Sequence, residues 1–251
     1  MKTLFFSIAF FASLSFSCKK ESEPAPELSC DKGVRIISQQ LGTIPVSIQY
    51  DSKGRISKVF RSDGQGLIEN YQYTSDTTLT VTRNSKDGGV TNTYKAILNK
   101  KGYVTSYSML GSFAYTSTYR YDDNGFLTEQ TTKFETPKQT IRSVYAYQNG
   151  SRVSEISHTD GVQSYSDEYK YSENAGQADL IFNSNQPDLY GRYSARLPEA
   201  INRKYKDGKT ESYTFTYQLN KKGLVESLKQ VYTDTDKKST EQVNLYKYEC
   251  K

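Results

Sequence analysis

The sequence predicts an all-β protein, an antiparallel up-and-down meander of roughly 16 strands that forms a closed or nearly closed flattened barrel. Three observations support this fold class. A unit of Tyr, a short turn and Gly recurs along the chain, two classes of turn alternate, and the segments between turns alternate between apolar and polar residues. No stretch shows sustained helical periodicity.

The first element is a predicted signal peptide, residues 1–17. Lys2 supplies a positive start, and Leu4–Phe16 is an apolar run too short to span a bilayer. Its removal takes away Lys2, so the net charge falls from +5 to +4. Charges of both signs are interspersed without a basic stripe, which gives no support to nucleic-acid binding.

The second element is Cys18, which directly follows the small residue Ser17. A Cys at this place, followed by the polar residues 19–26, resembles a bacterial lipoprotein leader. Such leaders usually have Leu three residues before the Cys, whereas here that residue is Ser15. We therefore predict that Cys18 is lipidated, with an ordinary signal peptide as the alternative.

The third element is a predicted flexible tether, residues 18–32, rich in Lys, Glu, Ser and Pro. A single repeat-built β-domain, residues 33–251, follows it. Cys30 and Cys250 stand near the two ends of the mature chain. An even pair of cysteines in an exported protein is a candidate disulfide, which would staple the barrel closure; two unrelated buried thiols are the alternative.

The repeat defines the organisation of the domain. Its copies are Tyr50–Ile56, Tyr121–Leu127 and Tyr147–Val153, and the variant Leu-Asn-Lys-Lys-Gly occurs at Leu98–Gly102 and Leu219–Gly223. The repeat positions are Tyr50, Tyr73, Leu98, Tyr121, Tyr147, Tyr171 and Tyr217. The first five steps are 23, 25, 23, 26 and 24 residues, and the last is 46. We interpret the last step as two periods in which one copy has been overwritten.

The turns fall into a short class and a variable class. The short turns are Asp51–Gly54, Asn99–Gly102, Asp122–Gly125, Gln148–Gly150 and Asn220–Gly223. The variable turns are Ser62–Gly66, Leu110–Ser112, Glu135–Lys138, His158–Gly161 and Thr233–Lys238. Gly and Asn supply the positive φ that tight hairpins need. Strict alternation predicts that each class lies at one end of the sheet.

The strand segments alternate in character from residue to residue. Tyr213, Phe215 and Tyr217 lie on one face, and Thr214 and Thr216 lie on the other. We predict that the aromatic face is buried and that the polar face is aqueous, unlike the apolar band of a transmembrane barrel.

Apolar residues stand three apart just after the short turns. The pairs are Ile56/Val59, Val104/Tyr107, Val153/Ile156 and Val225/Leu228. A spacing of three puts both residues on one face only if one residue is inserted, so we predict a repeated β-bulge.

The segment Asn183–Ala200 interrupts the meander. It carries the candidate ligand- or partner-binding residues Leu189, Tyr190, Tyr193 and Leu197. Long loops in compact domains are often functional. The alternative is a connection that plugs a barrel too wide for its wall side chains to fill.

The Tyr-Asp-x-x-Gly-Arg-Ile unit resembles the Tyr-Asp repeat of Rhs-type proteins. With its leader, the chain also resembles Bacteroidota-type lipoproteins of unknown function that carry a porin-like β-fold. The segment Leu197-Pro198 is similar to that family as well, and the resemblance covers about residues 33–250. It implies an architecture but no activity.

Catalytic chemistry has little support in this sequence. The single His, His158, lies in a predicted variable turn, and there is no Cys-x-x-Cys, calcium loop or phosphate-binding Gly motif. We expect no catalytic residues, no metal and no cofactor. The 22 Tyr could stack sugars or flat ligands, although packing between strands explains them better.

These observations predict a non-catalytic, lipid-anchored cell-envelope protein that binds an unidentified ligand or protein partner. We expect it to be an outer-membrane lipoprotein on the cell surface or the periplasmic face, touching the membrane only through its lipid. Glu21 and Glu23 resemble a surface-export signal. The alternative is a structural shell or adhesin-like protein without a small-molecule site. An internal cavity lined by Tyr and polar groups would favour the first function, and a dry core the second.

Overall fold

The computed structural model describes residues 33–61, 66–85, 87–109, 114–171 and 189–250. Within these residues every regular element is a β-strand. The strands are β1 (Val34–Leu41), β2 (Ile44–Tyr50), β3 (Ile56–Arg61), β4 (Ile68–Ser75), β5 (Thr78–Asn84), β6 (Val90–Leu98), β7 (Val104–Met109), β8 (Tyr115–Tyr121), β9 (Leu127–Phe134), β10 (Gln139–Gln148), β11 (Ser151–Thr159), β12 (Val162–Tyr171), β13 (Pro198–Tyr205), β14 (Thr210–Leu219), β15 (Val225–Thr233) and β16 (Ser239–Cys250).

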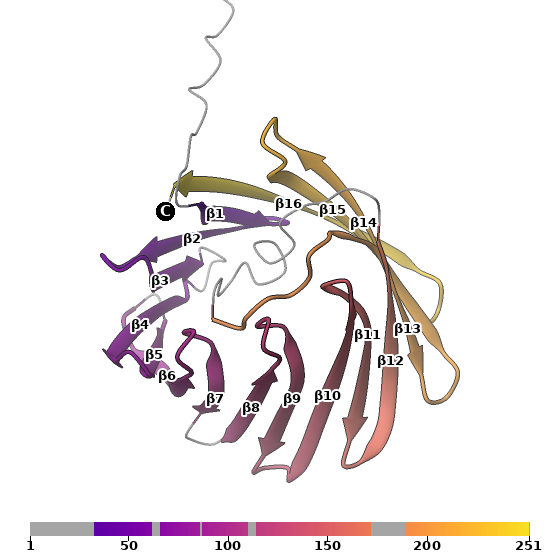
Figure 1. Cartoon of the computed structure of the whole chain (residues 1–251), viewed down its shortest axis with the longest axis horizontal. Helices are drawn as coiled ribbons and strands as arrows, with labels where there is room; N and C mark the ends of the chain where they lie inside the picture. The colour runs from indigo at the N-terminus through magenta and orange to yellow at the C-terminus, as the bar shows by residue number, and fades with distance from the viewer. Residues whose placement is uncertain (1–32, 62–65, 86, 110–113, 172–188, 251) are drawn as a thin grey trace, which may run out of the picture.

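The strands form a closed barrel in which each strand pairs antiparallel with its neighbours in the chain (Figure 1). The last strand returns to the first, with Val34 opposite Cys250. The Arg35 Nε donates to Glu249 Oε1 at 2.7 Å across this closing pair. Closure removes the free edges that an open sheet would expose. The predicted all-β meander and its closure are therefore confirmed.

The short turns share one hydrogen-bonding arrangement, which explains their sequence. In the β2–β3 turn, Asp51 Oδ1 accepts the backbone N–H groups of Lys53 and Arg55, both at 2.9 Å. Gly54 has φ 78°, a conformation that other residues adopt at a cost. Asn99 and Asn220 cap the β6–β7 and β14–β15 turns in the same way. The Asp or Asn of the repeat therefore folds the turn.

The Tyr of the repeat joins neighbouring hairpins. Its hydroxyl donates to a backbone carbonyl near the start of the preceding odd-numbered strand. The pairs are Tyr50 to Ile36, Tyr121 to Val104, Tyr147 to Leu127, Tyr171 to Arg152 and Tyr217 to Pro198, at 2.6–2.9 Å. Tyr248, near the end of β16 and outside the repeat positions, donates in the same way to the Val225 carbonyl at 2.6 Å. The residues that carry these carbonyls are buried, and a buried carbonyl without a donor would be costly. This contact explains why the repeat keeps Tyr rather than Phe.

The predicted β-bulge lies just after the short turns. In the β2–β3 pair, Gln49 lies opposite Lys58 and Tyr50 opposite Ile56, so Ser57 is the extra residue. Equivalent register shifts occur in the β6–β7, β8–β9, β10–β11 and β14–β15 pairs. The bulge prediction is confirmed.

One of the four predicted apolar pairs, Val153/Ile156, does not face the interior of the barrel. Tyr147 pairs with Arg152 and Ala146 with Ser154, so Val153 is the inserted residue and Ile156 is exposed. The inward pair of β11 is Arg152 and Glu155 instead.

The interpretation of the 46-residue step was also wrong. The strands β12 and β13 are neighbours in the barrel, so no strand is missing between Tyr171 and Tyr217. This period is an ordinary one whose short turn is replaced by the connection 172–197. Residues 172–188 of it lie outside the described residues.

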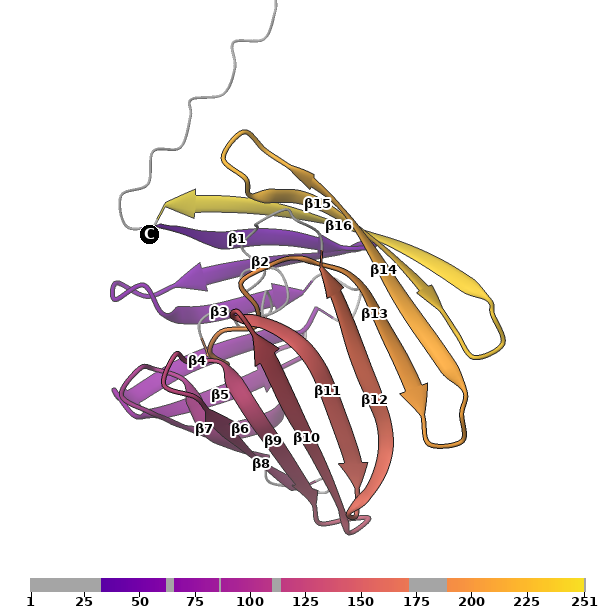
Figure 2. The ribbon, with the colours of Figure 1, turned by 45° about the vertical axis from the view of Figure 1, so that its right-hand side comes forward.

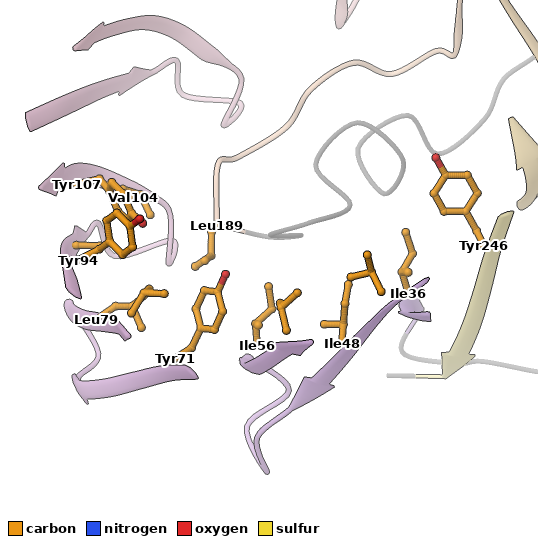
Figure 3. Close-up of a cluster of buried hydrophobic side chains, with 14 of the residues drawn as sticks. Ile36, Ile48, Ile56, Tyr71, Leu79, Tyr94, Val104, Tyr107, Leu189 and Tyr246 are labelled. Carbon is orange, nitrogen blue, oxygen red and sulfur yellow. The ribbon is translucent and has the colours of Figure 1, made fainter. Parts of the chain in front are cut away.

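The core lies against the inner wall of the barrel. Figure 3 shows Ile36, Ile56, Leu79 and Val104 pointing inward from different strands. The end of the barrel that carries the short turns is called here the short-turn rim, and the opposite end the variable-turn rim. Inward residues near the short-turn rim are mostly buried, whereas many near the variable-turn rim are half exposed.

Candidate functional site

The described part of the predicted loop, Leu189–Leu197, is called here the strap; it crosses the barrel interior at the short-turn rim (Figures 1 and 2). Leu189 and Leu197 are buried in the hydrophobic core. The Tyr190 ring packs on Tyr119 with 5.1 Å between ring centroids, and Tyr193 packs on Arg152. The structure therefore places the four predicted residues inside the barrel at this rim.

The strap is attached to three short-turn hairpins by its backbone. The Val104 N–H donates to the Leu189 carbonyl, the Arg192 N–H to the Gly125 carbonyl, and the Ala195 N–H to the Gly150 carbonyl, each at 2.8 Å. Satisfied backbone groups let this irregular segment lie in a buried position. The short-turn end of the barrel is thereby covered.

A buried cation lies where the strap meets β10–β12. Arg152 is only 6% exposed. Its guanidinium lies 4.3 Å from the Tyr145 ring centroid and 4.1 Å from that of Tyr193, and it donates to the Tyr147 hydroxyl at 3.2 Å. Among the described residues, no carboxylate lies within ion-pair distance of it. Burial opposes the charge, but the surrounding tyrosines raise the pKa of Arg152 above its usual value, so it stays charged.

A carboxylate lies further along the same strand. Glu155 accepts the Tyr165 hydroxyl at 3.0 Å and the Tyr169 hydroxyl at 3.5 Å. Burial, followed by the negative charge of Glu155, raises the pKa of Tyr165 to about 12. The phenol therefore remains a protonated donor at neutral pH. Arg152 and Glu155 serve the packing of the barrel wall, since aromatic groups satisfy both.

The inner wall toward the variable-turn rim has a different character. The Tyr213 and Tyr232 rings face inward and lie 4.9 Å apart, and both residues are half exposed. A cavity of about 310 Å³ is lined by Tyr213, Gln230, Tyr232, Thr240, Glu241 and Gln242. Inward-facing groups can be exposed only where solvent enters the barrel. This wall is therefore accessible to a small molecule.

Two ion pairs lie on the open part of the wall, where the inward carboxylate of Glu211 also accepts the Tyr205 hydroxyl at 2.8 Å. Arg203 donates from Nε and Nη2 to the buried carboxylate of Asp167, at 2.8 and 2.9 Å. On the facing side of the barrel, Arg83 Nη2 donates to Glu69 Oε1 at 2.6 Å. A charged ligand would have to compete with these pairs, so the wall favours uncharged ligands.

A second cavity lies at the short-turn rim, between the β2–β3 and β6–β7 turns. Its volume is about 340 Å³. It is lined by Lys53, Gly54, Arg55, Ile56, Tyr73, Asp76, Leu98, Lys100, Lys101, Gly102 and Leu189. The charged residues of this lining are four basic side chains and one carboxylate, Asp76. The lining of the inner-wall cavity, in contrast, contains one carboxylate, Glu241, and no basic side chain.

The remaining predicted residues are placed as follows. Cys18 and Cys30 lie outside the described residues, and Cys250 ends β16. His158 lies in β11 rather than in a turn, because that strand runs to Thr159. Among the described residues no group of acidic, His and Cys side chains could hold a metal ion. The described residues also contain no helix long and apolar enough to cross a membrane.

Sequence reasoning missed Arg152 and Glu155 as inward residues. The signal was available in the turns. Counting two residues on from the turn Gly leads to Ile56, Val104 and Val225, which are all buried, and after Gly150 it leads to Arg152. The prediction chose Val153 because it is hydrophobic. The register of the bulge instead makes Arg152 the inward residue.

Two solved structures resemble this fold. A porin-like protein from Bacteroides uniformis superposes with a TM-score of 0.64 at 18% identity, over 85% of this chain and 96% of that chain. A porin-like protein from Bacteroides vulgatus has a TM-score of 0.58 at 14% identity, over 84% and 97%. No protein-family model and no curated protein matches the chain. At these identities the likeness concerns the fold, and it supports the porin-like β-fold expected from the sequence.

Proposed function

We propose that this protein is a non-catalytic, lipid-anchored component of the bacterial cell envelope that binds a small ligand inside the barrel. The observation that carries the proposal is the accessible inner wall with Tyr213 and Tyr232, whose rings lie side by side over a cavity of about 310 Å³. The likeness to porin-like proteins of Bacteroides supports an envelope location. Exposed polar residues such as Thr116, Glu168 and Lys170 on the outward face support contact of the wall with water.

The wall chemistry favours an uncharged ligand that carries a sugar or flat ring. The tyrosine faces can stack on such a ring, and their hydroxyls can exchange hydrogen bonds with its polar groups. Gln230 and Gln242 add amide donors and acceptors to the same cavity. A few convergent polar groups on an aromatic wall are typical of small-molecule sites.

Replacing both wall tyrosines tests this function. We expect Tyr213→Ala with Tyr232→Ala to weaken binding of neutral oligosaccharides, such as maltohexaose or xylohexaose, by about tenfold or more, because two stacking faces are lost. Isothermal titration calorimetry measures the affinity. Thr214→Ala, on the outward face of the same strand, is the matched control and should bind normally. If neither probe binds the wild-type protein, the shell or adhesin alternative is favoured.

Lipid attachment at Cys18 is tested separately. We expect cells supplied with a labelled fatty acid to incorporate the label into the protein, with Cys18 as its first residue, because Ser17-Cys18 follows the apolar run. Cys18→Ala should abolish labelling. Peptide mass spectrometry that finds a different, unmodified N-terminus would refute the anchor.

The proposed disulfide between Cys30 and Cys250 has support from the barrel register. Val34, four residues after Cys30, lies opposite Cys250. A disulfide needs Cα atoms within about 7 Å, which this short connection can provide. The bond would close a loop of 250 − 30 = 220 residues, for which chain entropy predicts at most about 5 kcal/mol. Non-reducing peptide mapping should find the linked peptides; two alkylatable thiols in the exported protein would argue against the bond.

A further inference from the structure

Both copies of the motif Leu-Asn-Lys-Lys-Gly lie at the short-turn rim, and none of their residues lines the proposed ligand cavity. Both copies form short turns, and in each turn the Asn side chain caps the backbone. Lys100, Lys101, Lys221 and Lys222 are exposed at the tips. Because the Asn side chain and the Gly fold the turn, the turn does not itself require lysine at these positions. Lys101 Nζ donates to the Asp123 carbonyl of the neighbouring turn at 2.5 Å.

The two lysine turns lie on opposite sides of the same rim. One joins β6 to β7 and the other joins β14 to β15, so they are eight strands apart in the ring of described strands. The β2–β3 turn, with Lys53 and Arg55, lies midway between them on one side. Cations distributed in this way around a rim can reach a flat surface together.

The two rims differ in charge. Over the described turns and the strap, the short-turn rim carries the cations Lys53, Arg55, Lys100, Lys101, Arg192, Arg196, Lys221 and Lys222 and the acids Asp51, Asp76, Asp122 and Asp123. The variable-turn rim carries Lys138, Lys206, Lys209, Lys237 and Lys238 and the acids Asp87, Glu135, Asp160, Asp207, Asp234 and Asp236. Among the described turns and the strap, basic residues therefore outnumber acidic ones at the short-turn rim but not at the variable-turn rim.

The described domain also begins at the short-turn rim. Gly33 precedes β1, and the Ile36 carbonyl accepts the hydroxyl of Tyr50, which ends β2 just before its short turn. Cys18 lies 33 − 18 = 15 residues before Gly33. If the predicted tether behaves as a random coil, a segment of that length has a root-mean-square span of about 20 Å. A lipid on Cys18 would hold this rim, rather than the opposite one, near the membrane.

We propose that the short-turn rim docks on an anionic membrane surface, with the variable-turn mouth directed away from it. This inference rests on the lipid anchor proposed above, which would supply a high local concentration. The occupant is a layer of lipid headgroup phosphates. The cavity lined by Lys53, Arg55, Lys100 and Lys101 has room for a phosphate group. Its one acidic residue, Asp76, lies 3.6 Å from Lys53 and 3.9 Å from Arg55, so a phosphate would compete with this carboxylate for those two cations.

The test uses the mature chain with Cys18→Ala, so that no lipid contributes. All described strands lie between Val34 and Cys250, so this protein keeps the whole barrel. We expect it to sediment with vesicles of phosphatidylcholine containing phosphatidylglycerol, not with phosphatidylcholine alone, and to be released by about 0.5 M salt. Binding to the neutral vesicles at equal strength would overturn the proposal.

Reversing the charge of the rim lysines tests whether the short-turn rim is the surface that binds the vesicles. Lys100→Glu and Lys101→Glu, combined with Lys221→Glu and Lys222→Glu, should weaken vesicle binding by at least about tenfold. Lys206→Glu with Lys209→Glu at the opposite rim is the control and should change it less than about twofold. Equal weakening by both sets would overturn the proposal. If the fourfold variant does not fold, Lys221→Glu with Lys222→Glu alone must still weaken binding more than the control. Fatty-acid labelling of Cys18 decides the anchor independently.

Discussion

Gly191→Ala should destabilise the protein by about 3 kcal/mol, combining backbone strain with a steric clash. Gly191 has φ 67°, and a Cβ at this position would lie 2.5 Å from the Gly125 carbonyl oxygen and 2.7 Å from the Tyr121 ring. The turn backbone cannot retreat without breaking the hydrogen bond of Arg192 to Gly125, and the half-buried Tyr121 ring is held by its hydroxyl, which donates to the Val104 carbonyl at 2.7 Å. Denaturant unfolding, followed by circular dichroism, measures the change.

Gly161→Ala is the matched control for this prediction. Gly161 has φ 83°, but a Cβ there would meet nothing within 4 Å. Both substitutions carry the backbone cost of about 1–2 kcal/mol, and only the one at Gly191 adds the clash. Equal free energies of unfolding for the two variants would show that the strap does not press on the β8–β9 turn.

Tyr217→Ala should cost about 3 kcal/mol, the lower part of the range for large aromatic truncations, because its ring is half-buried. The ring packs with Phe215 at 6.5 Å between centroids, and its hydroxyl donates to the Pro198 carbonyl at 2.7 Å. Truncation removes the packing and leaves that carbonyl without its donor. Urea unfolding at constant pH provides the measurement.

Thr216→Ala, one residue away on the outward face, should cost less than about 1 kcal/mol. Tyr217→Phe separates the two contributions, since it keeps the ring and removes only the hydroxyl; we expect about 1–2 kcal/mol for it. If Thr216→Ala proved as costly as Tyr217→Ala, the assignment of inner and outer faces would be wrong.

The number and order of the strands, and the facing of β14, were predictable because they depend on local signals. Period-two alternation determines which residues of β14 face inward, and the Asp or Asn with Gly defines each short turn. The lysine turns were visible as a repeated motif, but their positions on opposite sides of one rim follow only from closure.

The sequence by itself determined an all-β meander, its two turn classes and its repeated bulge, since each arises from interactions within one hairpin. Only the tertiary structure decided the position of the strap, because its contacts with Val104, Gly125 and Gly150 join segments far apart in the chain. It also decided what surrounds Arg152, since the four tyrosines around this cation come from β10, β12 and the strap. Contacts of this kind depend on closure of the barrel, which no local pattern of residues encodes.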